Sequence, residues 1–284
     1  MLSLFVFALG AIVGSFLNVC IHRLPREESI VFPPSHCPRC GAPVKPYDNV
    51  PILSWLILRG RCRSCGGPIS PRYLAVELLT ALVFLGIFLT CVHAPGMLVV
   101  ALIFASSLIV VVFVDLEHQI IPDEISLGGI AFGLAASLAC PALHSSSVET
   151  PFLGDVVHAA ASWVPVLPAA SARSLVSAAL GIAVGGVLFW LIRAVSGKIY
   201  GEEAMGFGDV KLMAYFGAIL GPVLVLLTTF FASLIGSVTG LLLIGMKRAE
   251  LKSKLPFGPF LCLGALIAFL WGDRCISWYL DLLR

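Results

Sequence analysis

Charged residues are scarce in this chain of 284 residues, where Asp, Glu, Lys and Arg together make up 12% of the sequence. Hydrophobic residues make up 59%, and the mean hydropathy is +1.01. Because soluble domains carry about 25% charged residues, this scarcity excludes an ordinary water-soluble protein. The small net charge of +2 also excludes the dense basic surface with which proteins bind nucleic acid.

Apolar runs fill most of the sequence. The bilayer interior offers no water to unpaired backbone groups, so runs of about 20 apolar residues must form helices. We expect an all-α polytopic protein embedded in the lipid bilayer, with about eight spans at residues 2–21, 73–92, 97–115, 123–140, 175–195, 209–221, 223–246 and 256–272. The sixth segment is short and Gly221-Pro222 separates it from the seventh, so a count of seven stays open.

Lys and Arg gather in particular loops, and this predicts the orientation. With residues at the helix ends included, loops 22–72, 116–122, 196–208 and 247–255 hold 15 of the 18 Lys and Arg. Short loops rich in these residues stay in the cytoplasm, so we place these four inside. The polar, proline-broken segment 141–173 is placed outside.

Four cysteines form two Cys-x2-Cys pairs in the polar segment between the first and second apolar runs. They are Cys37, Cys40, Cys62 and Cys65. The spacing is close to that of a zinc ribbon, in which four thiolates close a tetrahedral site. Disulfides are the alternative, but a cytoplasmic loop lies in a reducing compartment. We expect a structural zinc ion that folds this small loop; His36 is a further candidate ligand, although four cysteines already complete the site.

Two aspartates stand at the ends of apolar runs. Asp115 closes the third run, and Asp209 opens the sixth. The chain crosses the membrane twice between them, so both lie at the cytoplasmic face. An ionisable group at the edge of the hydrocarbon is costly, which makes each aspartate a candidate functional residue.

Two carboxylates at one surface can share a proton, because like charges in a partly dry site cannot both ionise cheaply. One then acts as a base on water and the other as an acid, as in aspartic proteases. Gly206 and Gly208 would leave room for a substrate backbone beside Asp209. The alternative is that the aspartates merely cap helices, but Asp115 stands at a helix C-terminus, where the dipole disfavours a carboxylate.

Two other classes of function compete with a protease. A cation or proton transporter would use Asp115, Asp209 and Glu77 as relay groups, and it predicts acids near the bilayer midplane and some repeat symmetry, neither of which the sequence shows. A zinc-dependent sensor or scaffold would leave both aspartates unexplained.

With these motifs in view, the chain resembles the bacterial type IV prepilin peptidases, which are GxGD-type intramembrane aspartic proteases. The blocks that carry the resemblance are GSFLNVCIHRLP, the two CxxC pairs, RGRCRSC, SPRYLAVELLTA, VDLEHQIIPDEI and GFGDVKLMAYFGAILG. The resemblance places the family's catalytic aspartates on Asp115 and Asp209. It implies cleavage of a short basic leader from type IV prepilins or type II secretion pseudopilins at the cytoplasmic face of the inner membrane.

The resemblance also implies a second activity, N-methylation of the new N-terminal residue with S-adenosylmethionine as donor. It assigns that activity to residues 1–92, where Gly60 and Glu77 match positions linked to it, and the peptidase to residues 93–284. The external loop 141–173 is longer than is usual in the family. No G-x-G-x-x-G motif follows a strand, so no familiar nucleotide site supports the methyltransferase independently.

Overall fold

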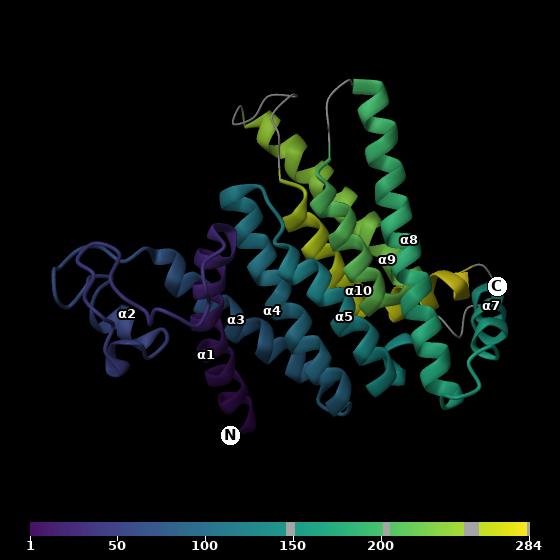
Figure 1. The fold of residues 1–284 in the computed structure, drawn as a ribbon, viewed down its shortest axis with the longest axis horizontal. Coiled ribbons are helices and arrows are strands. Elements are labelled where there is room, and N and C mark those ends of the chain that lie inside the picture. Colours follow the sequence, from purple (N-terminus) through teal and green to yellow (C-terminus); the bar gives the residue numbers. More distant parts are fainter. Residues whose placement is uncertain (146–150, 201–204, 247–255, 283–284) are drawn as a thin grey trace. The chain divides into compact units, whose positions relative to one another are not determined.

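The structure, a computed structural model, describes residues 1–145, 151–200, 205–246 and 256–282 (Figure 1). These ranges are built of helices and contain no β-sheet, which confirms the predicted all-α architecture. Packing divides the chain into two units, Met1–Val114 and Asp115–Arg284. The functional division expected at residue 92 stays a prediction, and the basic loop 247–255 lies outside the described residues.

The first unit holds two long apolar helices, the cysteine loop and most of a third helix. Its elements are α1 (Leu2–Arg23), η1 (Leu24–Arg26), η2 (Pro46–Asp48), α2 (Leu53–Ile57), α3 (Pro71–Cys91) and α4 (Pro95–His118). Ser70 begins α3 as its N-cap, since its hydroxyl accepts a hydrogen bond from the Arg72 amide.

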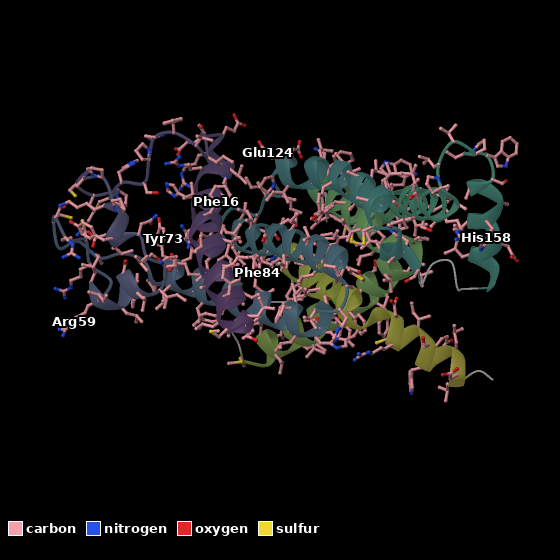
Figure 2. All side chains as sticks on the ribbon, turned by 90° about the horizontal axis from the view of Figure 1, so that it is seen from below. Phe16, Arg59, Tyr73, Phe84, Glu124 and His158 are labelled. Atoms are coloured by element: carbon pink, nitrogen blue, oxygen red, sulfur yellow. The ribbon has the colours of Figure 1, made fainter. Side chains whose placement is uncertain are left out.

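Helices α1 and α3 pack closely because glycines face the contact. A Cβ atom at Gly10 would lie 2.7 Å from the Cα atom of Ala81, so only glycine permits this approach. Val6, Phe84 and Phe88 form a buried apolar cluster at the same contact, and Phe84 is labelled in Figure 2. Helices α1 and α3 therefore form a closely packed pair, and the cysteine loop connects them.

The second unit carries the longer helices. They are α5 (Asp123–Ala139), η3 (Pro141–His144), α7 (Pro151–Ala161), α8 (Ala169–Tyr200), α9 (Phe207–Gly245) and α10 (Gly258–Leu282). The expected external segment thus contains η3, α7 and the start of α8.

Helix α9 contains both the sixth and the seventh expected spans, with a break at Gly221, where φ is 73° and ψ 178°. A Cβ atom at Gly185 of α8 would meet the Met213 carbonyl oxygen and would lie 3.1 Å from Cγ2 of Val225. In an unbroken helix, Met213 and Val225 would lie about 18 Å apart along the axis, so they could not both contact Gly185. The chain therefore reverses at Gly221-Pro222, and α9 is a hairpin of two helical arms.

In the described residues, six helices are long and apolar enough to cross a membrane. Two of the eight expected spans are the arms of α9, and another is α5, which has 17 residues. All eight expected apolar segments are thus helical. The first arm of α9, Phe207 to Leu220, is only about 21 Å long, which is shorter than the hydrocarbon core.

Candidate active site

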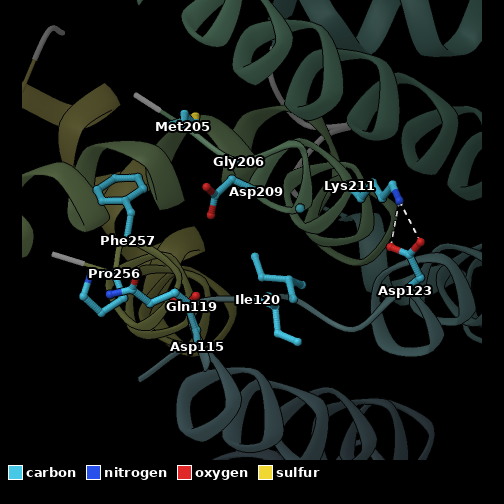
Figure 3. A pocket seen from close by; sticks show the side chains of 12 residues that line it. Asp115, Gln119, Ile120, Asp123, Met205, Gly206, Asp209, Lys211, Pro256 and Phe257 are labelled. Carbon is cyan, nitrogen blue, oxygen red and sulfur yellow. Dashed lines mark hydrogen bonds and ion pairs between the residues drawn. The ribbon is translucent and has the colours of Figure 1, made fainter. Parts of the chain in front are cut away.

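A pocket of about 390 Å³ opens in the second unit (Figure 3). Its lining comes from three segments, namely residues 115–123 around the end of α4, residues 205–211 at the start of α9, and residues 256–257 just before α10. Asp115 and Asp209 both line it, and their carboxyl groups lie within range of direct Coulomb interaction. The structure thus brings together the two carboxylates that the sequence singled out.

Asp115 stands on the last turn of α4 and is 7% exposed. Its Oδ2 atom accepts a hydrogen bond of 3.0 Å from the backbone N–H of Gly258. Gly258 is the first residue of α10, where backbone N–H groups have no partner within the helix. The start of α10 therefore supplies the donor that orients the Asp115 carboxyl group.

Gly258 is a site residue that the sequence analysis missed. A Cβ atom there would lie 2.5 Å from Oδ2 and 3.0 Å from Cγ of Asp115, so a side chain would displace the carboxyl group. Pro256 and Phe257 line the same pocket. The signal was a glycine between two prolines, Pro-Phe-Gly-Pro, at the mouth of the last apolar run.

Asp209 lies in the first turn of α9, for which Gly206 is the N-cap. Among the described residues, a Cβ atom at Gly206 would have no neighbour closer than 3.9 Å. A Cβ atom at Gly208 would lie 3.1 Å from Cβ of Ile121, so Gly208 also permits close packing. The role of both glycines in substrate approach stays a prediction.

Lys211 and Asp123 form an ion pair at the edge of the pocket. The Lys211 ammonium nitrogen donates to both carboxylate oxygens of Asp123, at 2.7 and 2.8 Å (Figure 3). The pair joins the second turn of α9 to the first turn of α5. It fixes one wall of the pocket beside Asp209.

The four predicted cysteine ligands are also brought together. One Sγ atom from each of Cys37, Cys40, Cys62 and Cys65 lies within 4.8 Å of the others. A tetrahedral zinc site with Zn–S bonds of about 2.3 Å places its sulfur atoms about 3.8 Å apart, so the four residues are positioned to bind a metal ion.

The two cysteine pairs have the same backbone geometry. Gly41 N–H donates to the Cys37 carbonyl and Gly66 N–H to the Cys62 carbonyl, each at 2.9 Å. Both glycines have a φ near +70°, which side chains disfavour. The N–H groups of Cys40 and Arg39 lower the pKa of the Cys37 thiol to about 6, whereas burial and the neighbouring thiols raise the pKa of Cys40 to about 11. In the absence of a metal, one thiol of the cluster therefore ionises before the others.

Gly60 and Glu77 both contact the short helix α2. Glu77 is buried, and its carboxylate accepts a hydrogen bond of 2.7 Å from the backbone N–H of Ile52, just before α2. Gly60 follows α2 with a φ of +63°, and a Cβ atom there would lie 2.8 Å from the Trp55 ring. The two positions therefore fix opposite ends of α2.

Two family models match the chain. One, the bacterial peptidase A24 N-terminal domain, covers residues 8–91, and the other, the type IV leader peptidase family, covers residues 102–241. No solved structure matches the chain.

Several curated relatives are similar over nearly their whole length. Proteins named prepilin leader peptidase/N-methyltransferase from Aeromonas hydrophila and Pseudomonas aeruginosa are 35% and 32% identical to this chain. The alignments cover 97% and 96% of this chain and 92% and 91% of those proteins. A protein of the same name from Legionella pneumophila is 34% identical over 94% of this chain and 91% of its own length.

Proposed function

The chain belongs to the type IV leader peptidase family, and from that premise we propose that Asp115 and Asp209 are the catalytic pair with which it cleaves prepilins. The observation that carries the proposal is that both carboxyl groups line one pocket, at the ends of two helices far apart in sequence. A transporter has no support, since the relatives are named as peptidases and methyltransferases.

The pair would act as acid and base on one water molecule. The ionised carboxylate takes a proton from water as its oxygen bonds to the peptide carbonyl carbon, and the protonated carboxyl group gives its proton to the carbonyl oxygen. The intermediate then collapses as the C–N bond breaks, the leaving amine takes one proton, and one proton stays on the pair. The Gly258 amide holds the Asp115 carboxyl group in place during these steps.

The substrates we propose are type IV prepilins and type II secretion pseudopilins. Such a substrate has an apolar helix in the bilayer and a short basic leader at its surface, with the cleaved bond between them. The pocket opens at the end of α4, which is long enough to span the hydrocarbon core, and at the start of the shorter first arm of α9. The predicted concentration of Lys and Arg in the flanking loops favours the cytoplasmic face of the inner membrane.

We propose that zinc occupies the four-cysteine site. The four thiolates of Cys37, Cys40, Cys62 and Cys65 complete a tetrahedral shell, and no position is left open for a substrate. Such an ion folds a loop that is too small to hold a core of its own.

Methyl transfer from S-adenosylmethionine is proposed for the first unit. Two buried polar atoms there have no hydrogen-bond partner within the described chain, namely Oδ1 of Asn18 and Nε1 of Trp55. A polar ligand would satisfy such atoms. Gly60 and Glu77 would act by holding α2 and Trp55 in place, because they fix the two ends of that helix.

Reconstitution of the purified protein with a prepilin in lipid vesicles tests this function. We expect the leader to be removed after its last glycine, and the new N-terminal residue to gain a methyl group only when S-adenosylmethionine is added. N-terminal sequencing and intact mass report both steps. A prepilin that stays intact under these conditions would contradict the assigned activity.

A further inference from the structure

A second pocket of about 390 Å³ lies in the first unit and shares no lining residue with the aspartate pocket. One wall is a face of α1 that contains Ile12, Phe16, Val19 and Arg23. These residues are three or four positions apart, so they follow one side of the helix. The other wall comes from segments 30–35 and 49–51 of the cysteine loop.

Arg23 carries a buried charge. Its side chain is 7% exposed, and its guanidinium donates to the carbonyl oxygens of Ser29 and Pro33, at 2.7 and 2.6 Å. Within the described ranges, it forms no ion pair. Because guanidinium has five N–H donors and a buried charge is costly without a counter-charge, this site favours an anion.

The position of Arg23 along α1 corresponds to the level of lipid headgroups. Helix α1 has 22 residues and is about 33 Å long, close to the thickness of the hydrocarbon core. Arg23 is its last residue, so the guanidinium lies at one edge of that core. Phe16 and Ile12 lie about 10 and 16 Å deeper along the axis, and their side chains are 50% and 59% exposed.

More positive charge lies at the same end of α1. Arg26, Arg72 and Arg23 are all close enough to His22 for Coulomb interaction with its ring, as is one carboxylate, Glu28, so the net charge around His22 is positive. Clusters of Lys and Arg at a membrane edge attract anionic lipids. The neighbouring loop also exposes Val31 and Phe32, which are suited to the interface between headgroups and acyl chains.

We propose that this pocket binds one anionic phospholipid, with its phosphate on Arg23 and an acyl chain along Val19, Phe16 and Ile12. The apolar wall distinguishes a lipid from a soluble anion, which needs no such surface. A bound lipid would hold segment 29–35 against α1, since Arg23 already contacts the carbonyl groups of that segment.

Native mass spectrometry of the full-length protein in mild detergent tests the proposal. Phosphatidylglycerol and phosphatidylethanolamine with identical acyl chains are the probes. We expect one phosphatidylglycerol per chain, bound at least about tenfold more tightly than phosphatidylethanolamine, and a loss of about tenfold or more in Arg23→Gln. The matched control is Arg274→Gln, which removes the same charge from an exposed side chain of α10 outside the pocket and should change binding less than about threefold.

A second variant covers the case in which Arg23→Gln does not fold. Val19→Phe fills the pocket while Arg23 keeps its charge, and it too should lower phosphatidylglycerol binding by about tenfold. Equal binding of the two lipids, or equal losses in Arg23→Gln and Arg274→Gln, would overturn the proposal. Competition by millimolar inorganic phosphate would show a site for a soluble anion only, and would overturn it as well.

Discussion

Gly258 contributes only backbone atoms to the aspartate pocket, yet its position is among the most restricted in the chain. Its N–H donates a hydrogen bond to Asp115, and a Cβ atom added to Gly258 would contact the same carboxyl group. A glycine is required here because the start of α10 and the end of α4 meet at this atom.

Gly258→Ala should therefore reduce prepilin cleavage at least about 100-fold, the usual contribution of a positioned acid or base. The added methyl group would lie 2.5 Å from Oδ2 of Asp115 and would push the carboxyl group away. Cleavage kinetics with a purified prepilin measure the loss. Gly128→Ala is the matched control, because that glycine is exposed on α5 and a Cβ atom there meets nothing within 4 Å; a normal rate in Gly258→Ala would disprove the role of the amide.

The sequence predicted Asp115 and Asp209 because each interrupts an apolar run with a group that the bilayer penalises. Counting membrane crossings then placed them on one face. Gly258 and Lys211 were missed for a physical reason: a backbone amide has no signature in composition, and an ion pair to Asp123 depends on contacts across 88 positions. Side-chain chemistry could be read from sequence, but its backbone and long-range partners could not.

His144 gives the fold a pH dependence. The ring is fully buried, and its Nδ1 atom lies 2.8 Å from Oγ of Ser174. Burial lowers the pKa of His144 to about 4, against a smaller opposing effect of the Ala218 carbonyl. Between pH 6.5 and 4 the unfolded chain therefore binds more protons at this site than the folded chain does.

The free energy of unfolding should accordingly fall as the pH drops from 6.5 to 4, by about 3 kcal/mol at most from this residue. Thermal unfolding in detergent across this range measures the slope. His144→Gln should flatten it, whereas His158→Gln, at an exposed position of α7, should leave it unchanged. An equal slope in the wild type and His144→Gln would exclude this histidine as its source.

At the scale of helices, α8 and α9 cross at glycines. A Cβ atom at Gly181 would overlap the Gly217 carbonyl oxygen, and one at Gly217 would overlap the Gly181 carbonyl oxygen. The first arm of α9, which carries Asp209, is thus held directly against the α8 backbone. No side chain at this contact can move to relieve a clash.

Gly181→Ala should destabilise the protein by about 1–3 kcal/mol or more, the usual cost of overpacking. The melting temperature in detergent is the readout, and prepilin cleavage should fall with it. Gly197→Ala lies on the same helix, where a Cβ atom meets no described atom within 4 Å, and should keep the wild-type melting temperature. Equal melting temperatures for both variants would contradict the close crossing.

The cysteine loop should depend on its metal independently of the aspartates. We expect one zinc per chain in protein purified under reducing conditions, and its loss in Cys37→Ser, because three ligands leave the tetrahedral shell incomplete. Elemental analysis measures the zinc. Cys91→Ser on α3 is the control, since Cys91 lies outside the four-cysteine cluster.

Cleavage should persist at least partly in Cys37→Ser while methyl transfer or stability is lost. Complete loss of cleavage in a folded, zinc-free variant would show that the peptidase needs the metal directly.

The sequence predicted the positions of the helices better than it predicted which helices pack against one another. Gly221-Pro222 correctly separated two segments, since a glycine with positive φ followed by proline breaks a helix. The bounds differ by up to ten residues at the end of α10, where the helix continues to Leu282 past the apolar run. The glycine crossings of α8 with α9 could not be predicted, because glycine alone does not say which backbone will approach it.

At the scale of the whole molecule, the candidate chemistry is divided between two packing units. The metal-binding cysteines and Glu77 lie in Met1–Val114, and both aspartates lie in Asp115–Arg284. The two family models match the chain in the same order, at residues 8–91 and 102–241. The proposed assignment of methyl transfer to the first part of the chain and of cleavage to the second is compatible with this division, and it stays a prediction.

The most direct test of the proposed catalytic pair is to replace each aspartate singly with asparagine, which keeps the size and polarity of the side chain but removes its acid–base function. Asp115→Asn and Asp209→Asn should each fold and bind zinc as the wild type does, yet cleave a purified prepilin at least about 100-fold more slowly. Asp123→Asn, which lines the same pocket but pairs with Lys211, should stay within about tenfold of the wild-type rate. Wild-type cleavage by either Asp115→Asn or Asp209→Asn would contradict the proposed catalytic pair.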